Sequence, residues 1–590
     1  MNQTFQLHWL DFVAFFGYII LLAVVGWYYG RKKGTSQEYF LAGRSLPWYV
    51  VGSSYIASNI SIEHFVGMIG AAVLYGICVA TPEWSTIIAF TFMIWVFIPF
   101  LFSSKVYTAP EFLEKRFNKE MRYIFGAITI IANIFVFMGP VLYGGSLILV
   151  KLFGVDKMMA PIYIGLATGI FAIWGGLKSV AFMDVVTIVF KIGGGLIVTV
   201  LGLLWLGSHY GDGGILEGFR IMVKSNFAED GLAKEWVTKN IGHFLNGNTD
   251  GQTYQRMHVL QPINQETNPW THWVFSFFYI GLWYTAFNQH LIQKVFAAKD
   301  MYHARMGIVF ASFLKLLVPL VVVFPGLIYF AIAVNDPTSF LHTQSWDFIN
   351  DEVNNTYIVM VRDYVPVFLV GILMAAFFGA IQSTISSVIN STSTIFTMDF
   401  YQTLINKKAS EKKTVQVGQI TGIVILVLAI IFAIILGNAK TNLFVFIQAS
   451  YTFIGPPFSA IFLLGMLWKR VNGKDALITL AASFALSIFL KYLEFGPLAD
   501  SQSELAGIIK PFGNQGLITW IFAMMVCSIS AWITAPPKEE QVGEGLVFSI
   551  ADKKLLWSGL GDKWYKSVTL WWSIAFGAMV LIVLYFSVFI

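Results

Sequence analysis

Long apolar runs, separated by short polar segments, dominate the pattern along this chain. A helix that crosses a membrane needs roughly 20 consecutive and mostly apolar residues. The pattern predicts about fourteen such helices, which together account for roughly half of the chain. Their approximate ranges are 9–29, 49–72, 79–102, 123–151, 159–176, 181–208, 271–295, 306–334, 363–398, 416–437, 441–468, 473–492, 515–535 and 568–590.

The polar segments between these runs alternate in charge. Lys and Arg collect in the loop after every odd-numbered span, whereas the even loops are short or acidic, as in 335–360. Basic loops remain on the cytoplasmic side of a membrane. The alternation therefore predicts that both termini lie outside and that 209–270 forms an outside lid, with 536–566 as an inside linker. Examples of the basic residues are Arg31, Lys105, Lys178, Lys294, Lys407, Lys469 and Lys538.

Composition agrees with a membrane protein and excludes several other classes. The 590 residues are 57% hydrophobic and only 12% charged, against about 25% charged in soluble proteins. So apolar a chain has too little polar surface for a soluble multidomain enzyme. A nucleic-acid-binding protein is excluded as well, because the net charge of +5 is small and lies in the loops. Cys78 and Cys527 lie in apolar runs, so they predict neither a disulfide framework nor a metal site. No cluster of transition-metal ligands and no nucleophile–base pair is visible, so we do not expect an enzyme.

Two of the predicted spans contain polar interruptions. Span 2 carries Ser, Asn, Glu and His over 53–65, and span 7 is interrupted around 281–289. A membrane helix can break only where protein or a water-filled cavity satisfies its backbone, and the break then offers groups for ions and solutes. A Ser-rich interface between packed helices is the alternative interpretation of span 2.

Spans 2 and 7 are five spans apart, so they run in opposite directions through the membrane. This arrangement is typical of transporters built from inverted repeats, with the ligand between the repeats. We therefore predict a leading helix and loop at 1–48, a first repeat at 49–208 and the lid at 209–270. A second repeat at 271–470 and accessory helices at 471–590 complete the chain.

Ionisable residues within the spans are the first candidates for function. Each costs at least ~2.5 kcal/mol near the bilayer centre, so it usually lines a cavity. Snorkelling or an internal ion pair is the alternative for any one of them. The residues are Glu63, His64, Glu83, Asp184, Lys191 and Lys315.

Span 9 adds a row of hydroxyl groups. Ser383, Ser386 and Ser387 share one helical face, with Ala380 one turn before them. Hydroxyl and carbonyl oxygens suit a hard cation such as Na⁺ better than a transition metal. Close helix packing is the alternative explanation of such a row.

Several motifs together give the chain a family resemblance that extends over nearly its whole length. They are Phe40–Trp48 (FLAGRSLPW), Ala57–Ile60 (ASNI), Tyr107–Thr108 with Pro110–Phe112, Glu114–Phe117 (EKRF), Gly175–Leu177 with Asp184, Asn390–Thr392 with Phe396–Asp399, and Gly455–Pro457 with Trp468–Arg470. With these motifs the sequence resembles the sodium/solute symporters, and among them the sodium/sugar cotransporters. The resemblance implies an all-α, leucine-transporter-like fold of two five-helix inverted repeats with extra helices, about fourteen in all.

The resemblance also implies where sodium would bind. A first site would use the carbonyls of Ala57, Ile60 and Ala380 with the hydroxyls of Ser383 and Thr384. A second site, found in some members, would use Asp184, Ser383, Ser386 and Ser387. Single-sodium members often have Ala where Ser386 stands, so the resemblance predicts two Na⁺ per solute.

The sugar branch implies a solute site as well. Its matching residues are Asn59, His64, Glu83, Thr86, Lys315 and Gln448, whose donors and acceptors suit a polyol. The matching gates are Met68 and Phe444 outside and Tyr284 inside. Thr285, Pro82 and Gly281 depart from the usual pattern of this branch, so the solute can differ from glucose and galactose.

Lys191 has no role in the resembling family. It follows Asp184 by seven residues, on roughly the same helical face. An ammonium group near a sodium site would weaken cation binding. We therefore expect Lys191 to be a snorkelling or structural residue.

Together these observations predict a multi-pass protein of the plasma (inner) membrane. Its function would be sodium-coupled uptake of a sugar such as glucose or galactose by alternating access. Na⁺ would be the coupling ion, without an organic cofactor, and the partners would be the sugar, sodium and the bilayer, without nucleic acid. Symport of inositol, of sialic or another acidic sugar, or of another small polar solute is the alternative, and a membrane sensor on the same scaffold is a further one.

Overall fold

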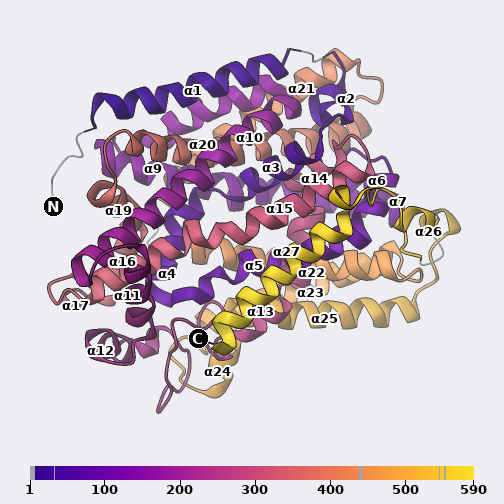
Figure 1. Cartoon of the computed structure of the whole chain (residues 1–590). Helices are drawn as coiled ribbons and strands as arrows, with labels where there is room; N and C mark the ends of the chain where they lie inside the picture. The colour runs from indigo at the N-terminus through magenta and orange to yellow at the C-terminus, as the bar shows by residue number, and fades with distance from the viewer. Residues whose placement is uncertain (1–6, 32–33, 438–442, 544, 550–552, 590) are drawn as a thin grey trace.

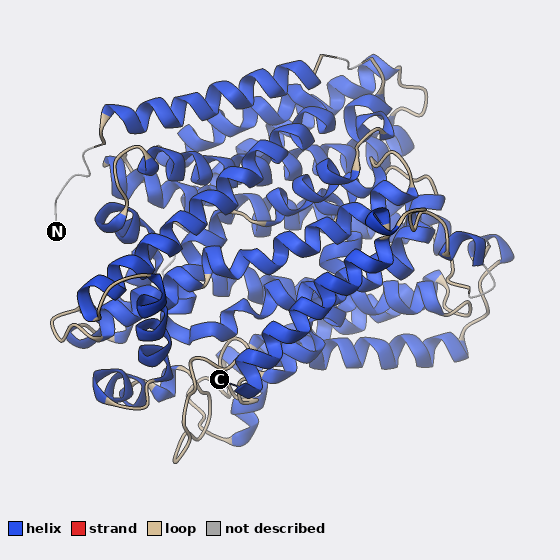
Figure 2. Cartoon of the chain, viewed as in Figure 1, coloured by secondary structure: helices blue, strands red, loops and turns tan. Residues whose placement is uncertain are grey.

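The computed structural model describes residues 7–31, 34–437, 443–543, 545–549 and 553–589, without the side chains of 152, 153, 174, 443, 444, 553 and 589. Within these ranges the chain is helical and contains no named strand, only isolated bridges (Figure 2). The apolar pattern therefore gave the right fold class.

Most of the described residues lie in long helices. These are α1 (Trp9–Tyr29), α3 (Trp48–Asn59), α5 (Thr81–Phe92), α7 (Ala109–Arg116), α8 (Lys119–Ala132), α9 (Gly139–Phe153), α10 (Ala160–Tyr210), α11 (Ile215–Phe227), α12 (Gly231–Lys239), α14 (Gln289–Phe296), α15 (Met301–Val322), α16 (Phe324–Val334), α19 (Thr356–Tyr364), α20 (Leu369–Ile395), α21 (Glu411–Leu436), α22 (Leu443–Leu467), α23 (Gly473–Phe495), α25 (Phe512–Ile533) and α27 (Val568–Leu584).

Shorter α-helices and wide π-helical turns connect them. The short α-helices are α2 (Ser36–Leu41), α4 (Ile69–Tyr75), α6 (Ile98–Ser103), α13 (Trp270–Ser276), α17 (Phe340–Thr343), α18 (Trp346–Glu352), α24 (Glu504–Ile509) and α26 (Lys553–Leu556). The π-helical turns are His64–Met68, Met93–Phe97, Asn133–Met138, Phe277–Gly281, Trp283–Phe287, Phe396–Ile405 and Tyr585–Phe589. The 3₁₀ turns are Ala42–Arg44, Gly76–Ala80, Ile241–His243, Val353–Asn355, Glu539–Gln541 and Trp564–Lys566.

Among the described residues, eleven helices are long and apolar enough to cross a membrane. The other three predicted spans, 49–72, 159–176 and 271–295, do not match one of these eleven helices over their length. The first and third are broken, and the second holds the short apolar helix Ala160–Ile173. The predicted number of about fourteen spans and the position of the termini stay predictions.

Both predicted helix interruptions are present. The first ends α3 at Asn59, where Ile60 leaves the helical conformation (ψ 100°) and the chain resumes as a π-helical turn at His64. The second follows the π-helical turn Trp283–Phe287 and lies at Asn288 (ψ 114°), before α14. The two breaks lie side by side, because the Tyr55 hydroxyl donates to the carbonyl of Thr285 (2.8 Å).

A third interruption divides α10. Gly176 has φ +64°, a conformation that glycine adopts without the strain of a Cβ. A Cβ at this position would also lie 3.1 Å from Tyr39. The single helical element α10 therefore contains both predicted spans 159–176 and 181–208.

The helices run side by side through the molecule, and the polar segments collect at its two ends (Figure 1). The segment 209–270, with α11 and α12, lies at one end, whereas α2, α7 and α26 lie at the opposite end. The predicted outside lid and the predicted inside loops are therefore on opposite sides of the bundle, as the charge alternation requires. Which end faces outside stays a prediction.

The segment 209–270 is anchored to the second half of the first broken helix. The guanidinium group of buried Arg256 donates to the carbonyls of Ala72, Val73 and Leu74 at the C-terminal end of α4. The last carbonyls of a helix generally lack partners within it, and of these three the Ala72 carbonyl also accepts from the Gly76 amide. The lid therefore donates hydrogen bonds to the end of the broken helix as well as covering it.

Candidate functional site

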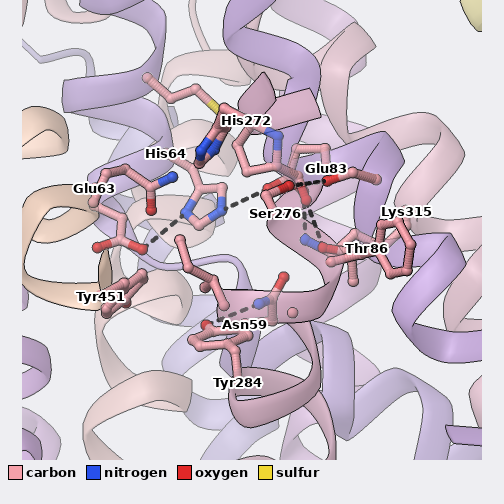
Figure 3. A pocket seen from close by; sticks show the side chains of 17 residues that line it. Asn59, Glu63, His64, Glu83, Thr86, His272, Ser276, Tyr284, Lys315 and Tyr451 are labelled. Carbon is pink, nitrogen blue, oxygen red and sulfur yellow. Dashed lines mark hydrogen bonds and ion pairs between the residues drawn. The ribbon is translucent and has the colours of Figure 1, made fainter. Parts of the chain in front are cut away.

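The six side chains predicted to bind a solute line one buried cavity between the two breaks (Figure 3). They come from α3 and its break, α5, α15 and α22, so the fold brings together residues far apart in the sequence. The cavity is lined by Asn59, Glu63, His64, Met68, Pro82, Glu83, Ser85, Thr86, His272, Ser276, Phe277, Ile280, Gly281, Tyr284, Lys315, Gln448 and Tyr451. The predicted convergence is confirmed, and the role of these residues in binding stays a prediction.

An ion pair and a histidine form one wall of the cavity. Lys315 Nζ donates to Glu83 Oε2 at 2.6 Å, and both side chains are buried. His64 Nε2 lies 3.4 Å from Glu83 Oε1. Because His64 Nδ1 accepts from the Ser61 amide (3.3 Å), the proton of a neutral His64 is on Nε2 and faces Glu83.

Asn59 and Tyr284 form the opposite wall. Asn59 Nδ2 donates to the Tyr284 hydroxyl at 2.9 Å. The amide oxygen Asn59 Oδ1 is buried without a hydrogen-bond partner and points into the cavity in Figure 3. A buried acceptor without a partner is costly unless a ligand or water satisfies it, so this oxygen is a candidate contact for a solute.

Two of the three predicted gate residues reach the cavity. Met68 and Tyr284 line it, and the ring of Tyr284 lies 5.3 Å from that of Tyr451. Phe444 belongs to α22, but its side chain is outside the described residues. The gating roles stay predictions.

The departures from the sugar-branch pattern fall partly within this site. Pro82 and Gly281 line the cavity, whereas Thr285 turns its hydroxyl to the carbonyl of Gly281 (2.7 Å) and is not a lining residue. Two of the three departures therefore line the cavity itself, and both have small side chains.

Eleven of the seventeen lining residues were not among the six predicted solute contacts, and four of these carry polar groups of interest. Glu63 drew notice only as a buried charge, and His272, Ser276 and Tyr451 were not singled out. Tyr451 follows Gln448 by three residues and Ser276 follows His272 by four, so helical spacing puts each pair on one face. This spacing is a signal that could have found them.

The predicted first sodium site contains a lysine side chain. Lys191 Nζ donates to the carbonyls of Ala57 (2.5 Å) and Ile60 (2.6 Å) and to Ser383 Oγ (2.7 Å). Of the other two predicted ligands, Ala380 O accepts from Ser383 Oγ (3.4 Å) and Thr384 Oγ1 donates to Ser58 O (3.2 Å). Three of the five predicted sodium ligands thus converge, and they converge on an ammonium group.

At the predicted second sodium site a lysine contacts one of the four predicted ligands. Lys294 Nζ donates to Ser387 Oγ (3.0 Å) and to Ser58 Oγ (2.7 Å). Asp184 Oδ2 accepts from Ser54 Oγ (2.6 Å), whereas Ser386 Oγ accepts from Gln382 (3.1 Å). The four predicted ligands therefore have separate partners here.

Of the two expectations about lysine, the one for Lys191 keeps only its structural alternative, and the one for Lys294 was wrong. Lys191 does not snorkel, because it is fully buried among backbone carbonyls. Lys294 is not an inside-loop residue, because α14 carries it into the bundle, where it is also fully buried. Its position close to the polar break of span 7 was the available signal.

A bundle of membrane-spanning helices, broken twice around a buried polar cavity, is the architecture of a solute transporter. The model of the sodium:solute symporter family matches residues 39–482. The chain therefore belongs to the sodium:solute symporter family, as its motifs indicated.

Curated relatives agree over most of the chain. The sodium/glucose cotransporter of Vibrio parahaemolyticus is 32% identical over 558 residues, which cover 93% of this chain and 95% of the relative. The human sodium/myo-inositol cotransporter is 30% identical over 547 residues, 89% of this chain and 73% of the relative.

A solved structure shares the fold. The substrate-bound, outward-open state of a Na⁺-coupled sialic acid symporter matches with a TM-score of 0.69 and 20% identity, over 90% of this chain and 99% of that chain. At this identity the similarity establishes the fold alone. The repeat boundaries 49–208 and 271–470 stay predictions.

Proposed function

We propose that this protein takes up a neutral polyol, such as glucose, galactose or myo-inositol, across the plasma membrane by alternating access. The observation that carries the proposal is the buried cavity that collects Asn59, His64, Glu83, Lys315 and Gln448 between the two broken helices. Similarity to a sodium/glucose and a sodium/myo-inositol cotransporter supports the same class of solute.

The charges of the cavity favour a neutral solute over an acidic sugar. Lys315 is the only Lys or Arg among the described lining residues, and its ammonium group is already paired with Glu83. Glu63 adds a second carboxylate to the lining. A sugar carboxylate would therefore enter a site whose one positive charge is used, next to a second negative charge.

Hydroxyl groups have suitable partners here. Glu83 and the free oxygen of Asn59 accept hydrogen bonds from a polyol, while Gln448 both donates and accepts. The adjacent rings of Tyr284 and Tyr451 offer a surface for the apolar face of a sugar ring. Tyr284 would close the cavity inward, and Met68 with Phe444 would close it outward.

The cation is a separate question. Family membership supports Na⁺ as the coupling ion, and the sequence predicts two Na⁺ per solute. That stoichiometry requires both oxygen sets to be open to sodium, yet both accept hydrogen bonds from a buried lysine.

Uptake of labelled solutes into proteoliposomes containing the full chain tests the solute class. We expect saturable uptake of at least one of glucose, galactose and myo-inositol, and no competition by sialic acid. Gln448→Ala should raise the KM about tenfold, the effect of losing about 1.4 kcal/mol of binding. Gln344→Ala is the matched control, because Gln344 is exposed in the loop after α17. Uptake of sialic acid without uptake of any neutral sugar would reject the proposal.

A further inference from the structure

The amine of Lys191 lies where the first broken helix ends. α3 stops at Asn59, so the carbonyls of its last turn lack partners within the helix. Lys191, which reaches the break from α10, bonds the carbonyls of Ala57 and Ile60. The C-terminal end of a helix carries partial negative charge and favours a cation. The same feature that predicts a sodium site therefore suits an ammonium group.

The hydrogen bonds require the charged form of this amine. Carbonyl oxygens only accept, so two of the three contacts need a proton from Nζ. The hydroxyl of Ser383 donates its own proton to the carbonyl of Ala57 (2.8 Å), so the third contact needs a proton from Nζ as well. Three donated protons make an ammonium group, which has three donors and no acceptor.

The lysine and a sodium ion cannot share this position. The three oxygens surround Nζ at 2.5–2.7 Å, so an ion bound by them would take the space of the amine. Two positive charges side by side would also repel strongly within the bundle. The lysine has the further advantage of attachment to α10, because a tethered group has a high effective concentration at its site.

The charged side chains near Lys191 also argue against a bound sodium ion. Lys294 bonds Ser58 and Ser387 at the second oxygen set, and Asp184 lies within electrostatic range of both lysines. One carboxylate thus already faces two ammonium groups. A bound sodium ion would increase the excess of positive over negative charge at this position.

We propose that the ammonium group of Lys191 takes the place that a sodium ion would occupy at the first oxygen set, with Lys294 beside it at Ser387, so that solute transport by this protein does not require Na⁺. Lys191 holds the broken end of α3 against α10 and α20 without a bound ion. The oxygens predicted to bind sodium are present, and the cation that they contact is the ammonium group of a lysine side chain. This inference rests on the proposed function in one respect only: the uptake measurement that tests it needs a solute that the protein transports.

The test compares solute uptake into proteoliposomes in NaCl and in choline chloride. For the wild type we expect initial rates that differ by less than about twofold, a free-energy difference well under the 1.4 kcal/mol of a tenfold effect. Lys191→Met frees the three oxygens, so its uptake should be slow in choline and stimulated about tenfold or more by Na⁺. Lys178→Met, on the same helix but only half-buried, should behave like the wild type.

Thermal unfolding in detergent gives a second readout that needs no solute. Ligand binding to the folded state raises the unfolding temperature, so NaCl should raise the Tm of Lys191→Met above its value in choline chloride and leave that of the wild type unchanged. This measurement still decides the question if none of the solutes is transported.

Three results would overturn the inference. They are wild-type uptake that needs Na⁺, a sodium-dependent Tm of the wild type, and a folded Lys191→Met that does not respond to Na⁺ in either assay. If Lys191→Met does not fold, the two wild-type measurements decide alone.

Discussion

At the scale of single residues, the site is a set of buried polar groups that satisfy one another. Glu83 and Lys315 neutralise each other at 2.6 Å, and Asn59 is oriented by Tyr284. Of the buried polar atoms of the described lining residues, Asn59 Oδ1 is the one without a hydrogen-bond partner. A buried polar network is stable when its members are paired, so the atom left over marks where a solute would bind.

The Glu83–Lys315 pair gives a prediction for stability and transport together. Removing one partner of a buried ion pair leaves an unpaired charge and typically costs about 3–5 kcal/mol. Glu83→Gln and Lys315→Met alone should therefore each lower the Tm in detergent strongly. The double variant should recover most of the Tm and still fail to transport, because the carboxylate of Glu83 and the ammonium group of Lys315 are both gone.

Thermal unfolding and solute uptake of the wild type, both single variants and the double variant form a complete cycle. If the losses of the single variants simply add in the double variant, the two side chains are not coupled. Recovery of transport in the double variant would contradict a role of Glu83 in binding.

At the scale of helices, α3 is held between neighbours that approach its backbone closely. Gly52 faces α15, and a Cβ at this position would lie 2.4 Å from the carbonyl of Gly307. On the other side, Lys191 of α10 and Thr384 of α20 bond the carbonyls of its last turn. The broken helix is therefore positioned by close packing along its length and by side-chain donors at its end.

Gly52→Ala tests this packing. The added methyl group must push α3 away from α15, and overpacking of this kind costs about 1–3 kcal/mol. We expect a lower Tm and slower uptake. Gly17→Ala on α1 is the matched control, because a Cβ there meets no atom within 4 Å, and it should leave both unchanged. Equal Tm values for the two variants would contradict the close approach.

At the scale of the whole molecule, the ends of the bundle differ in chemistry. The segment 209–270 lies at one end and the loops predicted to face inside at the other (Figure 1). Arg256 bonds this segment to the end of α4, so a movement of the broken helix would be transmitted to the lid. The cavity lies within the bundle, between the two broken helices.

The orientation can be tested by labelling single cysteines with a membrane-impermeant maleimide. The native Cys78 and Cys527 are fully buried, so background labelling of the folded protein should be low. Basic loops stay inside, so Glu229→Cys in the lid should react in intact cells. Lys538→Cys, in the linker after α25, should react only after the cells are permeabilised. The reverse pattern would show that the predicted orientation is wrong.

Sequence alone determined much of this protein. The cost of burying polar groups in lipid marks the spans and concentrates polar residues at two breaks, so the helix interruptions near Ile60 and Asn288 were predictable. The motifs gave the family, and with it the six residues that line the cavity.

Only the tertiary structure decided what the polar groups contact. Lys191 and Lys294 are long side chains on helices remote in sequence from α3, and their direction depends on how α10 and α14 pack against the break. The charge pattern led us to interpret Lys294 as a loop residue, because hydropathy does not show on which face of a helix a charged side chain lies. The pairing of Lys315 with Glu83 is likewise a contact that only the folded structure shows. The sequence determines which residues face the membrane and which face the core. Which charged side chains pair with one another depends on the distances between helices, and only the folded structure sets these distances.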